Sequence, residues 1–311
     1  MRPVPATVGP RQTSRAMRVV LYVLTGLTFF AGTQLFVLAE HTETFFSWPI
    51  DPAMTAAFVG AGFWSASVIS FWAARQPVWR HTRIPIPTIL AVAFLLLVAT
   101  LDHLETFEGL LGLAWIEVYA AFLPIMIAVV AMQLARPGHD TRSGEPLPRA
   151  LRGLSTAIAV ALVPLGLLLF ADPESASSLW PWELTELSGK AIGTWLTGIG
   201  IIHGVVAIAD ERSALPGNAL ADLVLGACSL LALARFGGDV ELGDAGAPVF
   251  LAIVVSTLAA GAWSALLCLR EGRFLPSRAE GGLPVELVGG AHADANGRAA
   301  TAELTGAAAG R

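Results

Sequence analysis

The chain has 311 residues, of which 55% are hydrophobic and only 14% are charged, and its formal net charge is −5 at pH 7. Soluble domains carry about 25% charged residues, so this composition excludes an ordinary soluble domain. The apolar residues form continuous runs of roughly 20 residues, enough to cross a hydrocarbon core of about 30 Å as a helix, whereas a membrane β-barrel needs alternating apolar and polar residues. We therefore predict an all-α membrane protein that contacts the lipid bilayer.

In chain order, a basic N-terminal segment (1–16) leads into a first set of four apolar runs (17–135). A basic linker (136–149) separates this set from a second set of four (150–269), and the tail (270–311) is rich in Gly and Ala and predicted to be largely disordered. The eight predicted transmembrane helices are Met17–Ala39, Pro52–Ala74, Ile84–Leu101, Gly112–Ala135, Ala150–Ala171, Leu187–Ala209, Leu215–Phe236 and Pro248–Leu269.

The charged residues outside the predicted spans alternate in sign along the chain. Arginines dominate the N-terminal segment, the connections after the second, fourth and sixth spans, and the residues after the eighth. Acidic residues dominate the other connections, where Lys190 and Arg235 are the basic exceptions. Because basic connections stay in the cytoplasm, we predict cytoplasmic N- and C-termini in the cytoplasmic membrane. Tryptophans fall at the expected interfacial belts, with Trp48, Trp115, Trp180 and Trp182 outside and Trp72 and Trp79 inside.

Two stretches of the chain resemble one another: FVLAEHTETFFSWPI (36–50) and LLFADPESASSLWPW (168–182). Each follows the first run of its set of four and contains Trp-Pro. Because four crossings are an even number, both sets insert in the same sense, and we predict two parallel four-helix repeats related by an axis along the membrane normal. Chance matching between Ala- and Leu-rich sequences is the alternative. The pairing of the first run with the fifth also argues against a cleaved signal peptide.

Small residues recur at four-residue spacing in the second and sixth spans. The two ridges are Gly62, Ala66 and Ser70, and Gly189, Gly193 and Thr197. Such ridges let helices approach closely in lipid, so we expect these spans to pack centrally, with contact between them as one possible arrangement. Pro124 in the fourth span and Pro164 in the fifth can each open a backbone hydrogen bond and kink the helix.

Four ionisable residues fall inside the predicted spans, where such groups are costly and mark candidate functional sites. Glu117 lies in the fourth span and Lys190 in the sixth, both toward the acidic side. His203 and Asp222 lie on consecutive spans, each roughly 9 Å from the basic side at about 1.5 Å per residue. A contact between His203 and Asp222 is therefore geometrically possible.

Asp222 also shares one stripe of its helix with Asn218, Gly226 and Ser229, because these positions are three or four residues apart. We expect this stripe to face the bundle interior, and we expect the same of the stripe around Glu117, which holds small residues. The candidate intramembrane polar site, mostly from the second half, comprises Glu117, His203, Asp222, Asn218, Ser229 and Lys190.

Each candidate has a structural alternative. Lys190 lies four residues after Glu186, as in a helical ion pair, and Glu117 could also pair with Lys190. His203 could be a neutral histidine bonded to a carbonyl, and Asp222 could cap or pair locally. The acidic segment LDHLETFEG (101–109) suggests metal binding, but zinc sites usually need three or four ligands at set spacing. We therefore expect a solvated loop there, with no metal and no cofactor.

Two functions of different classes fit the sequence. Transport or binding of a small solute or ion is favoured by the duplicated halves and the buried ionisable residues, since a histidine changes charge near neutral pH and can carry protons. The alternative is a non-catalytic accessory or scaffold subunit, which implies a membrane-protein partner or a homo-oligomer and no nucleic acid. The absence of Ser/His and HExxH arrangements disfavours an enzyme. The excess of arginine over lysine is typical of a GC-rich bacterial genome.

Overall fold

The structure is a computed structural model, and it describes residues 9–140, 144–241, 243–272 and 274. Within these residues the regular elements are helices, accompanied by two isolated β-bridges. Eight helical segments are long and apolar enough to cross a membrane. The described chain therefore has the helices of a multi-pass membrane protein, as the composition predicts. Most of the tail that the sequence predicts to be disordered, from residue 275 onward, lies outside the described residues.

The long helices are α1 (Arg15–Val37), α3 (Ala53–Ala74), α5 (Ile86–Asp102), α6 (Gly109–Leu134), α7 (Arg149–Ala171), α9 (Glu186–Ala209), α10 (Leu215–Phe236) and α11 (Gly246–Arg270). Short helical turns connect them: η1 (Ala39–His41), α2 (Thr42–Phe45), α4 (Trp79–Thr82), η2 (Leu104–Thr106), α8 (Pro173–Ala176), η3 (Ser177–Leu179), η4 (Arg212–Ala214) and η5 (Gly237–Asp239). The predicted spans match the long helices to within a few residues at each end.

Local chemistry explains where several helices begin. The Ser14 side chain caps α1 by accepting a hydrogen bond from the Met17 N–H, which satisfies one of the free donors of the first turn. In the third span the helix is interrupted after α4, and α5 begins at Ile86 with a proline in its first turn, where the missing N–H costs little. Pro124 and Pro164 do not end their helices, since α6 and α7 both continue past them.

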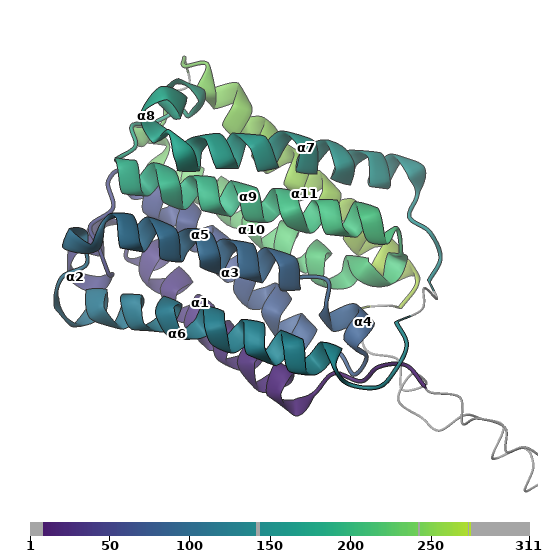
Figure 1. The fold of residues 1–311 in the computed structure, drawn as a ribbon. Helices are drawn as coiled ribbons and strands as arrows, with labels where there is room; N and C mark the ends of the chain where they lie inside the picture. Colours follow the sequence, from purple (N-terminus) through teal and green to yellow (C-terminus); the bar gives the residue numbers. More distant parts are fainter. Residues whose placement is uncertain (1–8, 141–143, 242, 273, 275–311) are drawn as a thin grey trace, which may run out of the picture. The chain divides into compact units, whose positions relative to one another are not determined.

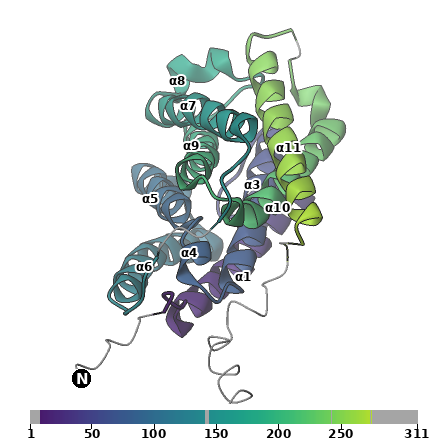
Figure 2. The ribbon, with the colours of Figure 1, turned by 90° about the vertical axis from the view of Figure 1, so that its right-hand side faces the viewer.

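The helices α3 and α9 lie at the centre of the bundle (Figures 1 and 2). Their membrane-length windows are 72% and 78% buried, against 17% to 50% for the other six spans. Contacts between helices occur in corresponding pairs: α1 packs on α3 as α7 packs on α9, α3 contacts α10 as α9 contacts α5, and α5 packs on α6 as α10 packs on α11. Contacts of α6 with α1 and of α11 with α7 complete a closed circuit of eight helices.

Glycines set the distance between α7 and α9. A β-carbon added to Gly193 would lie 2.5 Å from the carbonyl oxygen of Gly166, and one added to Gly166 would lie 2.5 Å from the Thr197 backbone nitrogen. The small-residue ridge of α9 therefore packs against α7, not against α3. The helix α3 meets α9 through another contact, where a β-carbon added to Gly62 would lie 2.7 Å from the ring of Trp195.

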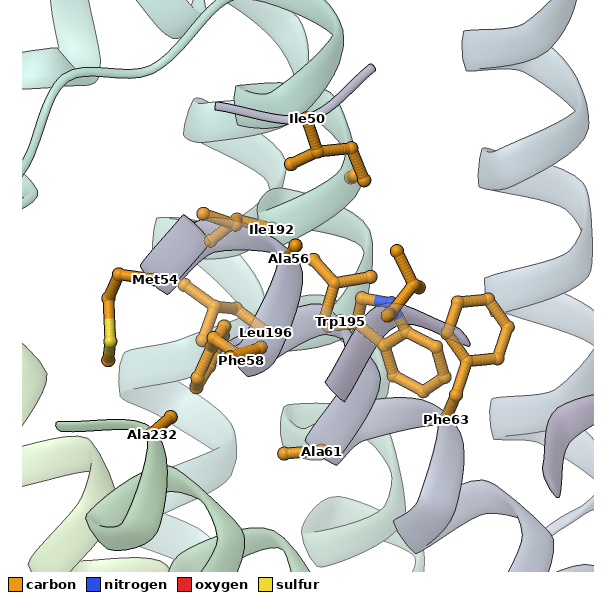
Figure 3. Close-up of a cluster of buried hydrophobic side chains, with 14 of the residues drawn as sticks. Ile50, Met54, Ala56, Phe58, Ala61, Phe63, Ile192, Trp195, Leu196 and Ala232 are labelled. Atoms are coloured by element: carbon orange, nitrogen blue, oxygen red, sulfur yellow. The ribbon is translucent and has the colours of Figure 1, made fainter. Parts of the chain in front are cut away.

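The core between α3 and α9 is aliphatic and aromatic, as the close-up in Figure 3 shows. Phe58 of α3 lies beside Leu196 of α9, and the Phe63 and Trp195 rings meet edge to face with centroids 4.7 Å apart. Such contacts stabilise a bundle in lipid through close packing, because lipid tails are as apolar as the side chains and give no hydrophobic gain.

The tryptophans that the sequence places at the membrane interfaces are buried inside the protein, so they are not lipid-facing anchors. At one end, Trp48 packs on Trp115 with ring centroids 5.0 Å apart, and Trp180 packs on Trp182 at the same separation. These four rings have exposed fractions of at most 8%. Sequence position gives the depth of a tryptophan along the membrane normal, but it does not say whether the ring faces lipid or a neighbouring helix.

The two ends of the bundle differ in charge. We call the end that carries residues 9–14, α4 and η4 the basic end, and the end that carries η1, α2, η2, α8 and η5 the acidic end. Both basic residues near the acidic end are paired: Lys190 Nζ lies 2.9 Å from an Asp102 oxygen, and Arg235 donates a hydrogen bond of 2.8 Å to the Phe36 carbonyl. The arginines therefore gather where the sequence predicts, apart from these paired exceptions.

Residues 9–14 lie across the basic end in an extended conformation. The Thr13 N–H donates to the Pro77 carbonyl at 2.8 Å. Fully buried Gln133 of α6 accepts a hydrogen bond from the Ser14 N–H at 2.8 Å and donates one to the Gln12 carbonyl at 2.9 Å. The segment before α1 is thereby joined to the α3–α4 connection and to the end of α6.

Candidate functional site: a buried polar cluster beside an apolar cavity

Three polar side chains from α9 and α10 meet inside the bundle toward its basic end. His203 Nε2 lies 3.4 Å from Asp222 Oδ1, and Asn218 Nδ2 donates a hydrogen bond of 2.9 Å to Asp222 Oδ2. His203 is 0% exposed, and Asn218 and Asp222 are each 3% exposed. Because α9 ends and α10 begins at the basic end, His203 and Asp222 lie at similar depth on the two helices. The His–Asp contact that the sequence makes possible is present.

The stripe of α10 that holds Asn218 and Asp222 is buried, as its spacing predicts. Gly261 of α11 lies against this stripe, and a β-carbon there would be 2.7 Å from the Asp222 β-carbon. The close approach of α11 covers one side of Asp222. Ser229 is also buried, about two turns farther along α10, but it lies outside the cavity described below.

The cluster retains unused hydrogen-bonding capacity. Among the described residues, Asn218 Oδ1 has no hydrogen-bond partner, and the ring nitrogens of His203 have none beyond the 3.4 Å contact with Asp222. Buried polar atoms are nearly always satisfied in folded proteins, so each exception calls for an explanation. Chemically, the pair can exchange a proton, and the free amide oxygen can accept a hydrogen bond from a ligand.

A cavity of about 290 Å³ lies beside the cluster, and Asn218 and Asp222 form part of its wall. Its lining comes from α1, α3, α5, α6, α9 and α10 and reaches from Ser47 near the acidic end to Pro85 near the basic end. The volume is close to the lower limit of about 300 Å³ for small-molecule pockets. Most of the lining is apolar, and its aromatic members are Phe30, Phe46, Phe63, Trp115, Tyr119, Phe122 and Trp195.

Lys190 lies apart from this cluster, at the acidic end. Its Nζ is 2.9 Å from an Asp102 oxygen and 3.2 Å from a Glu186 oxygen. Both carboxylates are largely exposed, with side-chain exposures of 48% and 64%. This geometry agrees with the structural alternative for Lys190, a local ion pair with Glu186, and it does not include Glu117.

The structure places Glu117 on the exposed surface of α6, together with Ala114, Ala121 and Pro124 of the same stripe. The prediction that this stripe packs inside the bundle is therefore wrong. The physical reason is that α6 is apolar on all sides, because lipid and protein interior accept the same side chains. The sequence of such a helix does not distinguish the face toward lipid from the face toward its neighbours.

The cavity walls are what sequence reasoning missed. The first four spans supply most of the lining, although the polar candidates point to the second half. The lining positions are ordinary Leu, Ile, Val, Ala and aromatic residues on six helices, so no spacing within one helix marks them. Five polar residues of the first half also line the cavity: Thr28, Gln34, Ser47, Ser65 and Thr88.

In the acidic segment between α5 and α6, His103 contacts a backbone carbonyl and one carboxylate. His103 Nδ1 lies 3.1 Å from the Ala99 carbonyl and its Nε2 lies 3.6 Å from Glu186. Among the described residues, no three His, Cys, Asp or Glu side chains lie together in a way that could hold a metal ion.

Comparisons of the chain with known protein families, with curated proteins and with solved structures found no match.

Proposed function

We propose that the protein lies in the cytoplasmic membrane with its basic end in the cytoplasm, and that it binds and moves a small solute or ion. The orientation rests on the arginines, because basic connections are retained on the cytoplasmic side. Both termini are then cytoplasmic. Site-directed labelling of single cysteines at each end, from each side of the membrane, tests this orientation.

We also propose that the chain arose from two parallel four-helix repeats. The corresponding helix contacts in the two halves support this proposal, since α1, α3, α5 and α6 neighbour one another as α7, α9, α10 and α11 do. The Trp-Pro stretches at 36–50 and 168–182 also match between the two halves of the sequence. The central helices α3 and α9 occupy equivalent positions in this scheme.

The observation that carries the solute-handling proposal is an apolar cavity whose wall contains the buried pair Asn218 and Asp222, with His203 in contact behind it. An ionisable group deep in a membrane bundle is costly to keep and typically marks a pathway for substrate or protons. His203 does not line the cavity and is 0% exposed. A proton can therefore pass from the cavity to Asp222 and then to His203, which itself has no contact with solvent.

A flux assay tests the proposal with the full chain in liposomes. Asp222→Asn keeps the size and one hydrogen-bonding oxygen but removes the charge and the proton-accepting group, so we expect a pH-dependent flux to be lost while insertion is unchanged. Asp172→Asn is the matched control, because Asp172 lies at the end of α7 outside the cavity. Equal fluxes in wild type and Asp222→Asn would refute the proton relay.

A second candidate function, helix association with another membrane protein, is favoured by one observation. The exposed stripe of α6 that holds Glu117 consists otherwise of small residues, which is the composition of helix–helix interfaces in lipid. A carboxyl group there is better accommodated against a polar partner than against hydrocarbon. Gentle purification of the tagged protein should then recover a stoichiometric partner or a homo-oligomer, and Glu117→Leu should release it. A strictly monomeric protein without a partner would contradict this role.

A further inference from the structure

The cavity reaches the surface on the flank between α1 and α6. Three of its lining residues are exposed there: Leu27 and Phe30 of α1, and Leu111 of α6, with exposed fractions of 39%, 62% and 37%. The helices α1 and α6 share a buried cluster toward the basic end, through Met17 and Met126 among others. Because the exposed residues belong to membrane-spanning helices, the opening faces the bilayer.

Polar residues line the cavity at both ends, and the free hydrogen-bonding atoms toward the basic end are acceptors. Asn218 Oδ1 and Thr88 Oγ1 are buried atoms in lining residues there, and neither has a hydrogen-bond partner among the described residues. The third such atom of the lining is a donor, Trp195 Nε1, and it lies on α9 nearer the acidic end. The amide nitrogen of Asn218 is already used on Asp222, so the atom left free on Asn218 is an oxygen. A carboxylate and an amide oxygen accept only, and a hydroxyl can accept as well as donate.

The shape of the cavity suits an extended apolar chain. Its lining reaches from Ser47 to Pro85, which is most of the depth of the bundle, yet its volume is about 290 Å³. A small volume over such a depth leaves a narrow space. A compact polar solute would leave most of the aliphatic and aromatic wall without a partner, whereas a hydrocarbon chain would contact it along its length.

We propose that the cavity binds a single-chain amphiphile with a primary ammonium head group, taken up from the bilayer between α1 and α6. The hydrocarbon chain lies along the apolar wall, and the three N–H donors of the ammonium group serve Asp222, Asn218 and Thr88. Pairing with a carboxylate offsets the cost of burying the cation. This inference rests on the proposed function, because it names the ligand class of the same cavity.

Tryptophan fluorescence tests the ligand directly, because Trp115 and Trp195 line the cavity. The full-length protein in mild detergent is titrated with a dibrominated octadecylamine, whose bromines quench nearby indoles, and with the matching dibrominated octadecanoate. We expect saturable quenching by the amine and only weak, non-saturable quenching by the carboxylate. Asp222→Asn should weaken the apparent affinity for the amine by about tenfold, as expected for loss of a charge-assisted hydrogen bond. Asp172→Asn should leave the affinity unchanged.

A second variant keeps the test decisive should Asp222→Asn fold poorly. Ala31 lines the cavity on α1 and is half-buried, so Ala31→Leu should narrow the opening and slow the quenching measured by stopped flow.

Equal quenching by amine and carboxylate overturns the ammonium assignment. If methylammonium raises the melting temperature in an Asp222-dependent way and the long-chain amine does not quench saturably, the amphiphile class is wrong and the proposed solute handling stands. If no tested solute or amphiphile binds, both proposals fail.

Discussion

Replacing Gly193 by alanine should force α7 and α9 apart. The added β-carbon would lie 2.5 Å from the Gly166 carbonyl oxygen and 2.7 Å from the Phe170 backbone nitrogen, whereas ordinary contact begins at 3.4 Å. The obstructing atoms are backbone, so no side-chain rotation relieves the overlap. The helices must separate by nearly 1 Å along their contact.

The expected cost follows from two opposing effects. Overpacking a tight contact costs about 1–3 kcal/mol, and replacing glycine by alanine inside a helix returns up to about 1 kcal/mol of helix propensity. We therefore expect Gly193→Ala to lower the free energy of unfolding by about 1–2 kcal/mol. Gly204→Ala on the same helix is the matched control, because its β-carbon would lie 3.6 Å from Ala159, at ordinary contact distance. That variant should be neutral or slightly stabilised.

The assay is equilibrium unfolding by sodium dodecyl sulfate in mixed micelles, followed by tryptophan fluorescence. A second variant tests the same contact from the other helix. Gly166→Ala should destabilise the protein to a similar degree, since its β-carbon would lie 2.5 Å from the Thr197 backbone nitrogen. Once the helices are separated, the second alanine costs less, so the double variant should lose less than both single losses combined. If Gly193→Ala and Gly204→Ala unfold at the same detergent ratio, the reasoning about the α7–α9 contact is refuted.

Two further predictions concern hydrogen bonds at the acidic end. The Trp182 indole donates to the Thr55 hydroxyl at 2.8 Å, whereas the Trp180 indole nitrogen has no partner among the described residues. Trp182→Phe should therefore be less stable than Trp180→Phe by about 1 kcal/mol in the same unfolding assay. Equal losses of stability in the two variants would contradict this prediction. Hydrogen bonds from Ser175 lower the pKa of Asp172, so their contribution to stability is present above the ordinary carboxyl pKa and is lost as the pH falls through the lowered one. Ser175→Ala should raise that pKa in a carboxyl NMR titration, and an unchanged pKa would argue against the bond.

The sequence predicts the helices well because the apolar runs end where charged residues begin. The seventh span, Leu215–Phe236, coincides with α10, and the sixth differs from α9 by one residue. The same regularity explains why a contact between His203 and Asp222 could be recognised as geometrically possible from the sequence. Depth along the membrane normal follows from the distance to the end of a run, and His203 and Asp222 have similar depths on consecutive helices.

Rotation about the helix axis is what the sequence does not determine. Glu117 lies at its predicted depth but on the outer face, and Trp48 lies at interface depth but points into the protein. In a soluble helix, polar residues mark the face toward water. In lipid both faces of a helix are apolar, so this marker is missing. The cavity depends on the rotation of six helices at once, and no single segment of the sequence contains that information.

The extended segment at residues 9–14 has a consequence for the order of assembly. Two of its hydrogen-bond partners come later in the chain: Pro77 lies in the connection after α3, and Gln133 lies near the end of α6. During synthesis this segment therefore waits until α6 has been inserted before its contacts can close. A segment that is translated before these helices is then among the last to complete its contacts.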